Sequence, residues 1–279
     1  MNPAASAPAL RTREARVGLA LLAVLGLASL AVALGWLAQG WDQAIDDQWS
    51  GPSLAHWFGT NRLGQDVFDR ALVGLLTAFS VGGIVTVGAI TLGALLGGLA
   101  GWHSGSAVDE ALQYLMGVID SIPIYLLAVA LAFSLGGGES AIILAMVLSF
   151  WTATARLVRA EVARLREREF ILAARAIGLP AWAILGRHLL PNTVHILLVQ
   201  ATLTFVAAIK TEVILSFLGI GAQDGVSWGL MLAESTQDVL AGHFGNFLAA
   251  SLLLFLLLLG LNLVADALQD AFDLREPAR

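Results

Sequence analysis

The sequence predicts an all-α polytopic membrane protein with six transmembrane helices, and three observations support this. Of the 279 residues, 58% are hydrophobic and only 13% are charged, whereas soluble domains average about 45–50% and about 25%. The apolar residues gather in runs long enough to cross a bilayer, which needs about 20 residues per helix. Many of the 29 glycines lie inside these runs, as is usual where membrane helices pack closely. Lipid is therefore the expected solvent for most of the chain.

Six apolar runs follow one another along the chain. The first follows several arginines and is longer than the apolar region of a signal peptide, which has roughly 7–15 residues, so we expect an uncleaved helix. The third and fourth runs are short; we expect residues 109–120 to lengthen the third and a basic stretch to continue the fourth. Five spans are the alternative. The six predicted spans are Val17–Leu37, Leu75–Ala100, Ile122–Leu135, Ser140–Thr154, Val194–Leu218 and Phe247–Ala267.

The charges between the spans predict the orientation of the chain, because Lys and Arg mark cytoplasmic segments. Three arginines precede the first span and seven lie between the fourth and the fifth, whereas the segment after the first span holds five aspartates and two arginines. We therefore expect both termini and the basic segment to be cytoplasmic, and the acidic segment to lie outside. Six spans satisfy all of these assignments. We divide the chain into residues 1–74, with the tail, first helix and outer segment, and the core at 75–279.

The stretch between the fourth and fifth spans has the pattern of two helices joined by a sharp turn. Helix-forming residues run on from the fourth span to about Ile177, Gly178 suits the left-handed position after a helix, and Pro180 blocks continuation. A second short helix is expected at Ala181–Leu190, ended by Pro191. The residues alone favour an interfacial helix pair held to anionic membrane lipid by arginines. The first helix also carries small residues that would let another surface approach its backbone, namely Ala173, Ala174 and Ala176.

This stretch resembles the EAA loop of ABC importer permeases, a cytoplasmic coupling element that docks into a cleft on the ATPase subunit. The family pattern is Glu-Ala-Ala, a Gly four residues after the last Ala, and a Leu-Pro further on. The chain keeps this spacing and departs from the pattern at Leu172, where the family usually has Glu. The resemblance implies an ATPase-coupling loop at about 158–192, with the site residues Leu172, Ala173, Ala174, Gly178, Arg187, Leu190 and Pro191.

The resemblance extends along nearly the whole chain. Four further segments resemble, in the same order, the permeases of the dipeptide/oligopeptide/nickel family: His56–Gly74, Glu212–Gly221, Ser227–Glu234 and Asn262–Arg275. The permeases of that family occur in pairs. With its six predicted spans and this sequence pattern, the chain resembles the second, shorter permease of the pair. The resemblance therefore implies the type I ABC importer permease fold with a cytoplasmic coupling helix, in the bacterial inner membrane.

The resemblance also implies the partners. A homologous second permease would complete the pathway, two ATP-binding subunits would lie below it, and a periplasmic substrate-binding protein would dock above it. The chain has no G-x-x-x-x-G-K-[ST] phosphate loop, so ATP and Mg would be bound by the partner ATPases. We expect no catalytic residue, no cofactor and no nucleic acid partner in this chain. Short peptides are the expected substrate, and nickel chelates or another small solute are the alternative substrates. The alternative function is that of an ion-gradient-driven secondary transporter.

Lys210 and Glu212 are ionisable residues inside the fifth apolar run. Ionisable residues within a span are candidates for function, here for a role in the pathway or in gating. The alternative is that they lie near the outer end of the span, where a long lysine side chain reaches the interface. No metal site is expected, because the chain has no cysteine and neither His56 nor His188 has a ligand partner at helical spacing.

Overall fold

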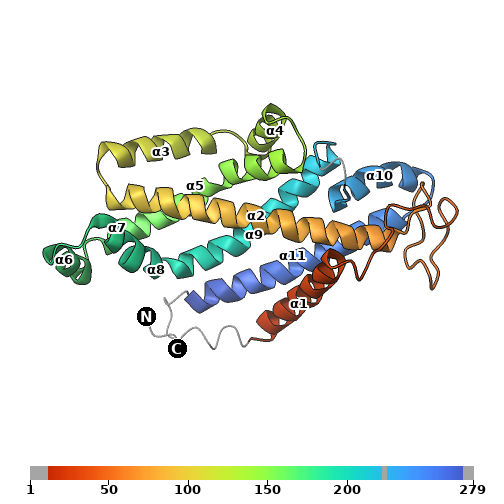
Figure 1. Ribbon diagram of the computed structural model, residues 1–279, viewed down its shortest axis with the longest axis horizontal. Coiled ribbons are helices and arrows are strands. Elements are labelled where there is room, and N and C mark those ends of the chain that lie inside the picture. Colours follow the sequence, from red (N-terminus) through yellow and green to blue (C-terminus); the bar gives the residue numbers. More distant parts are fainter. Residues whose placement is uncertain (1–11, 222–224, 273–279) are drawn as a thin grey trace.

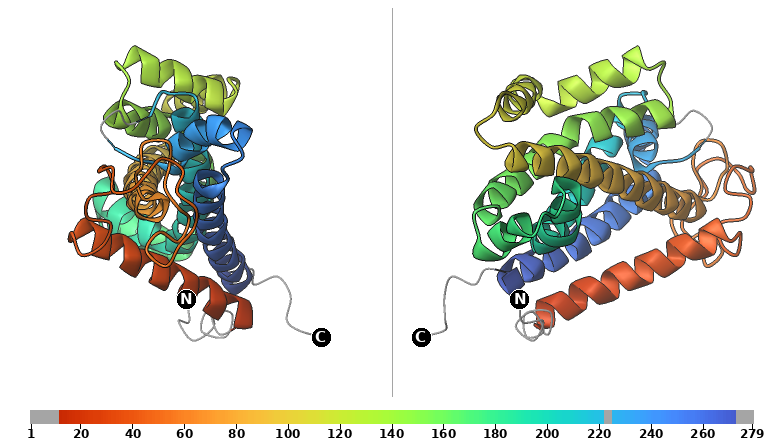
Figure 2. Two further views of the ribbon diagram at one scale, coloured as in Figure 1. Left: turned by 90° about the vertical axis from the view of Figure 1, so that its right-hand side faces the viewer. Right: turned by 60° about the vertical axis from the view of Figure 1, so that its left-hand side comes forward.

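The structure is a computed structural model that describes residues 12–221 and 225–272, and this part of the chain is built from helices and connecting loops. Five helices are long and apolar enough to cross a membrane. They run roughly side by side along the long axis of an elongated bundle (Figures 1 and 2). These spans are α1 (Arg13–Ala33), α2 (Val67–Trp102), α5 (Glu139–Leu165), α9 (Val194–Phe217) and α11 (Gly245–Phe272).

The sixth candidate span is a broken one. It consists of α3 (Ala107–Asp120) and α4 (Ile124–Ser134), which meet at an angle of 94°. Residues 109–120 thus lengthen the third candidate span as expected, but they do so with a sharp bend. Pro123 explains the break, because its ring disfavours helical backbone at the preceding residue and its nitrogen cannot donate a helical hydrogen bond.

α2 begins eight residues earlier than its apolar run suggested, because a polar cap starts it. The Asp66 side chain accepts a hydrogen bond from the backbone N–H of Asp69 at 2.9 Å, which satisfies one of the free donors of the first turn. In the same way, the Thr12 hydroxyl accepts from the Ala15 N–H at 3.1 Å at the start of α1. Hydrophobicity therefore located both helices, and the caps determined where they begin.

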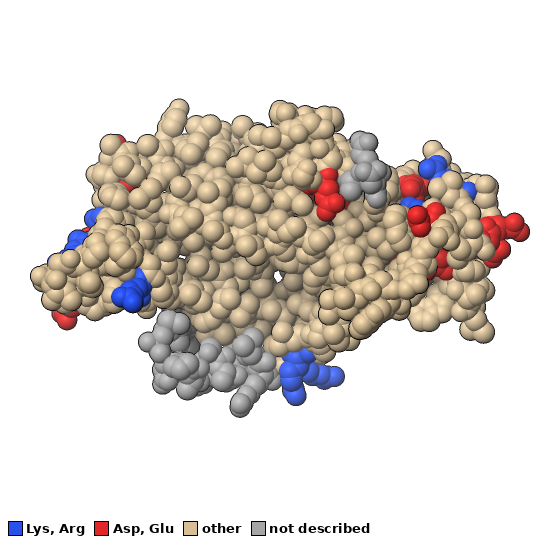
Figure 3. All heavy atoms as spheres, in the orientation of Figure 1, with Lys and Arg blue, Asp and Glu red and all other residues tan. Residues whose placement is uncertain are grey.

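The two ends of the bundle differ in charge. At one end lie the connection at residues 34–66 and α10 (Trp228–Leu240); Figure 3 shows acidic side chains gathered there, on the right. We call this the acidic end. The opposite end, called the basic end, carries arginines and the short helices α6 (Glu169–Ala176), α7 (Ala181–Ile184) and α8 (Leu190–Asn192).

Candidate functional site

The segment at residues 166–192, which we call the coupling segment, forms the tip of the basic end (Figure 1). α5 ends at Leu165 and α6 begins at Glu169, so the expectation of one continuous helix from the fourth span to Ile177 is wrong. Arg166 accounts for part of this break. Its guanidinium donates hydrogen bonds to two backbone carbonyls after α2, those of Trp102 at 3.0 Å and Ser104 at 3.3 Å.

The turn after α6 confirms the prediction made for Gly178. Its φ angle is +83°, in the left-handed region that glycine adopts most readily. The Gly178 N–H donates to the Arg175 carbonyl at 2.9 Å, and the Leu179 N–H donates to the Ala174 carbonyl at 3.1 Å. These are the two hydrogen bonds of a Schellman motif. The direction in which the chain leaves α6 is therefore set at a single residue.

Pro191 does not end the second helix, contrary to expectation. After α7 the backbone widens into a π-helical turn at Leu185–Leu189, and α8 follows with Pro191 in its first turn. The Leu190 N–H donates to the Leu185 carbonyl across this wider turn. Proline is tolerated in the first turn of a helix, where a missing N–H costs no intrahelical bond. The chain then enters α9 directly after Thr193.

One face of the coupling segment packs against α5. Ile171, Ile184 and Leu189 are fully buried. Ala174 belongs to the same face and is only 6% exposed. The surface that approaches this small side chain closely is α5 of the same chain, and a part for Ala174 in coupling stays a prediction. The α5 side of this cluster consists of Val158, Val162 and Leu165.

The opposite face of the coupling segment is exposed and largely apolar. Trp182 and Ile177 are 78% and 77% exposed, and neither was singled out from the sequence. The sequence pattern that could have identified them is the alternation of these apolar residues with buried positions along the same short segments. Exposed apolar side chains gathered at one place are typical of a protein contact. We define the outer apolar face as Phe170, Leu172, Ile177, Leu179 and Trp182.

The remaining predicted coupling residues divide between exposed and half-buried positions. Ala173, Gly178, Arg187 and Pro191 are exposed, and Leu190 is half-buried. Ala173 and Ala176 thus keep the accessibility expected of them, unlike Ala174. The Arg175 guanidinium lies over the Trp102 ring, 4.3 Å from its centroid, and this cation–π contact ties α6 to the end of α2. Two arginines of the segment therefore bind their own chain.

Lys210 and Glu212 are not brought together by the fold. Lys210 is exposed on α9, whereas Glu212 is 5% exposed and accepts a hydrogen bond from the Ser216 hydroxyl at 2.6 Å. Their assignment to the pathway or to gating stays a prediction. The two side chains have different surroundings, because Glu212 is enclosed by protein and Lys210 faces outward.

A cavity of about 350 Å³ lies between the α3–α4 bend, α5 and α9. Asp120 lines it, accepting hydrogen bonds from Thr152 Oγ1 at 2.7 Å and from Arg156 Nη2 at 2.6 Å. The sequence did not single out this group. Its signal was a carboxylate three residues before the break at Pro123, and the matching arginine follows 36 positions later.

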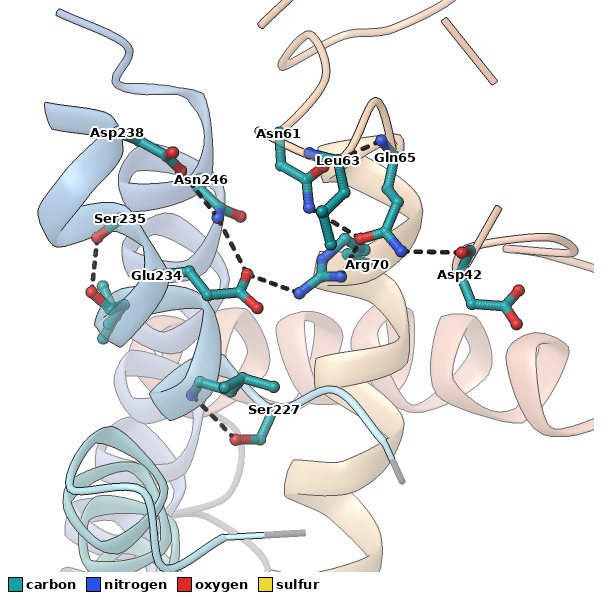
Figure 4. Close-up of polar contacts among 12 residues, drawn as sticks. Asp42, Asn61, Leu63, Gln65, Arg70, Ser227, Glu234, Ser235, Asp238 and Asn246 are labelled. Atoms are coloured by element: carbon teal, nitrogen blue, oxygen red, sulfur yellow. Dashed lines mark hydrogen bonds and ion pairs between the residues drawn. The ribbon is translucent and has the colours of Figure 1, made fainter. Parts of the chain in front are cut away.

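At the acidic end, a buried polar network joins three helices (Figure 4). Arg70 of α2 is 3% exposed and pairs with Glu234 of α10 at 2.7 Å, while also donating to Gln65. Asn246 at the start of α11 donates to Asp238 of α10 at 3.2 Å. The network links two of the segments that carry the family resemblance, at 56–74 and 227–234. Because the network is largely buried, we interpret it as a structural contact that holds the three helices together.

His56 lies against two carboxylates at the acidic end. Its Nδ1 lies 2.6 Å from Asp66 and its Nε2 lies 3.9 Å from Asp46. Within residues 12–221 and 225–272, no group of three His, Asp or Glu side chains is arranged to hold a metal ion. His56 therefore contacts the residue that caps α2.

The chain matches the family described as binding-protein-dependent transport system inner membrane component over residues 89–276. This range contains the cavity, the coupling segment and α9 to α11. It covers well over half of the chain.

Relatives with established names extend the match toward the N-terminus. A dipeptide transport system permease protein of Bacillus subtilis is 35% identical over 232 residues, 83% of this chain and 72% of the relative. A glutathione transport system permease protein of Pectobacterium atrosepticum is 38% identical over 225 residues, with 80% and 74% coverage. The glutathione transport system permease protein of an Escherichia coli strain is 38% identical over 268 residues, with 91% and 84% coverage. The chain therefore belongs to the family of binding-protein-dependent transport system inner membrane components.

Proposed function

We propose that this permease is one of two homologous membrane subunits of an ATP-driven importer for short peptides. The observation that carries the proposal is the coupling segment, which is anchored to α2 and α5 on one face and presents the outer apolar face on the other. A rigid element with an exposed apolar surface suits transmission of a movement from a partner. The family and the names of the relatives supply the class of machine.

In this proposal the outer apolar face docks into a cleft on an ATP-binding subunit. The two ATP-binding subunits hold ATP and Mg, and this chain contributes no catalytic residue. Closure of these subunits around ATP would move both coupling segments, and the permease pair would then open to the periplasm. The arginines around the segment meet acidic groups of the partner or the phosphates of membrane lipid.

The charges of the two ends support an orientation in the bacterial inner membrane. In this orientation the basic end faces the cytoplasm and the acidic end faces the periplasm, as the distribution of arginines favours. The two chain termini are likewise proposed to be cytoplasmic. A periplasmic substrate-binding protein would deliver substrate at the acidic end. Peptide is the proposed substrate class because two relatives of this chain carry dipeptide and glutathione in their names.

Native mass spectrometry of the complex, purified through a tag on this chain in mild detergent, tests the assembly. We expect the mass of this chain with one homologous permease and two ATP-binding subunits, and a further increase when the binding protein is added. A ligand mass retained on the binding protein would identify the substrate. Repeated recovery of this chain alone or as a homo-oligomer would contradict the proposal.

A further inference from the structure

The cavity beside Asp120 lies between the α3–α4 bend, α5 and α9. It lies near the middle of α5 and of α9, and its volume of about 350 Å³ falls within the range of roughly 300–1,000 Å³ typical of small-molecule sites. Its wall mixes aromatic and aliphatic groups with a few polar ones. The polar lining residues are Asp120, Ser149, Thr152, Gln200, Thr204 and Thr211.

Asp120 is the charged residue in the lining of this cavity. Arg156 partners it through Nε at 3.0 Å and Nη2 at 2.6 Å, yet the two side chains remain 39% and 51% exposed. The Asp120 carboxylate lines the cavity, and the Arg156 guanidinium bonded to it lies beside the lining with about half of its side chain exposed. Both charged groups are therefore accessible from the cavity side of α5.

A second ion pair between α3 and α5, that of Asp109 and Arg159, is more deeply buried than the pair of Asp120 and Arg156. Asp109 is held by Arg159 through two hydrogen bonds of 2.5 and 2.7 Å and also accepts from the Gly105 N–H at 2.9 Å. The side chain of Asp109 is only 2% exposed. Breaking a buried pair leaves an uncompensated charge, so Asp109 fixes α3 to α5. Asp120 is free to exchange its partner.

The position of Asp120 in α3 favours a cation. It is the last residue of that helix, and the C-terminal end of a helix carries a partial negative charge that adds to its carboxylate. Ionisable residues at membrane depth generally mark a substrate or ion path. An ammonium group that enters the cavity would find its most favourable site here.

We propose that this cavity binds a small zwitterion, namely an unblocked short peptide, by exchange of charges with the Asp120–Arg156 pair. The peptide ammonium replaces Arg156 at Asp120, and the peptide carboxylate binds the guanidinium thus released. Each charge keeps a partner throughout, so no lone charge is exposed to the apolar wall. The proposal rests on the proposed function and deepens it, because it assigns the recognition of peptide termini to this chain.

Site-specific thiol labelling tests the proposal, because the chain has no cysteine of its own. Ala153 lines the cavity and is exposed, whereas Ala160 is exposed on the same helix and does not line it. Ala153→Cys and Ala160→Cys variants of the complete transporter, in lipid vesicles without binding protein, are treated with a small water-soluble maleimide. A panel of unblocked dipeptides, such as L-alanyl-L-alanine, is added at increasing concentration.

We expect the dipeptides to slow labelling at position 153 and to leave position 160 unchanged. Their N-acetylated and C-amidated forms should protect much less, because each lacks one charge. In the Ala153→Cys background, Asp120→Asn should raise the half-protecting concentration about tenfold or more, the loss expected for a hydrogen bond to a charged group. Glu110→Gln is the matched control, since Glu110 is an exposed carboxylate of α3 outside the cavity lining.

Equal protection by the blocked peptides, equal protection at both cysteines, or no effect of Asp120→Asn would each overturn the proposal. Uptake of the same peptides by the transporter with its binding protein is measured in parallel. Uptake without protection at position 153 overturns the cavity site and leaves the proposed function intact. Neither uptake nor protection for the whole panel overturns both, because peptides are then not the substrate.

Discussion

Gly178 shows how one residue can set the geometry of a functional surface. Its positive φ directs the chain from α6 into α7, and an added Cβ would meet no atom within 4 Å. The requirement for glycine is therefore one of backbone conformation and not of space. A β-branched residue is the least suited to that conformation.

We predict that Gly178→Val abolishes uptake and leaves membrane insertion intact. The valine destabilises the left-handed turn by about 1–2 kcal/mol, which displaces the outer apolar face without touching the spanning helices. Gly178→Asn is the control, because asparagine tolerates this conformation and should retain most uptake. Normal uptake by the valine variant would remove the coupling segment from the mechanism.

The buried pair of Arg70 and Glu234 carries a second prediction for single residues. Arg70→Leu should lower the free energy of unfolding by about 3 kcal/mol, the lower end for a buried pair, because it leaves the Glu234 carboxylate, 14% exposed, without its cation. The double variant Arg70→Leu, Glu234→Leu should recover much of this loss. Thermal unfolding of the purified protein in detergent measures both. A double variant as unstable as the sum of the two single variants would show that the residues do not act as a pair.

Between elements, the closest contact is built on glycines. α2 presents Gly93, Gly97 and Gly101 to α5, and a Cβ at Gly97 would lie 2.4 Å from the Ala155 carbonyl oxygen. Without a hydrophobic driving force between helices in lipid, such close approach of backbones is a main source of packing energy. These glycines therefore hold α2 and α5 together along the basic half of the bundle.

We predict that Gly97→Ala destabilises the protein by about 1–3 kcal/mol, the usual effect of overfilling a packed contact. Gly83→Ala on the same helix is the matched control, because a Cβ there meets no atom within 4 Å. It should be neutral or raise stability by up to about 1 kcal/mol through helix propensity. Comparison of the two unfolding temperatures decides the point, and equal values would argue against close α2–α5 packing.

For the whole molecule, the separation of charge between the two ends leads to a prediction of orientation. Leu54 at the acidic end is 99% exposed, and the side chain of Glu167 at the basic end is 77% exposed. In this cysteine-free chain, a membrane-impermeant thiol reagent should label Leu54→Cys in intact spheroplasts and Glu167→Cys only after permeabilisation. Labelling of both from one side would indicate an even number of spans between them, as in the five-span alternative.

Features that depend on neighbouring residues could be predicted from the sequence. The spans follow from the lengths of apolar runs, because lipid requires every spanning backbone group to be bonded within its own helix. The turn at Gly178 follows from local backbone preference. The helix pair around Gly178 was also predicted, although the break after Leu165 and the continuation through Pro191 went against expectation; its coupling role stays a prediction. Both departures depend on contacts with α2 or on a local π-helical turn that no residue pattern announces.

The sequence by itself determined that this is a multi-pass membrane permease and that two short helices with a sharp turn at Gly178 lie between its fourth and fifth spans, because hydrophobicity, turn chemistry and motif spacing are properties of neighbouring residues. Only the tertiary structure decided which charges meet. Arg70 finds Glu234 across 164 positions, and Asp120 finds Arg156 at the edge of a cavity. The inward orientation of Ala174 was decided in the same way. Such pairings depend on how helices are rotated and bent against one another, and that rotation is set by packing over the whole bundle.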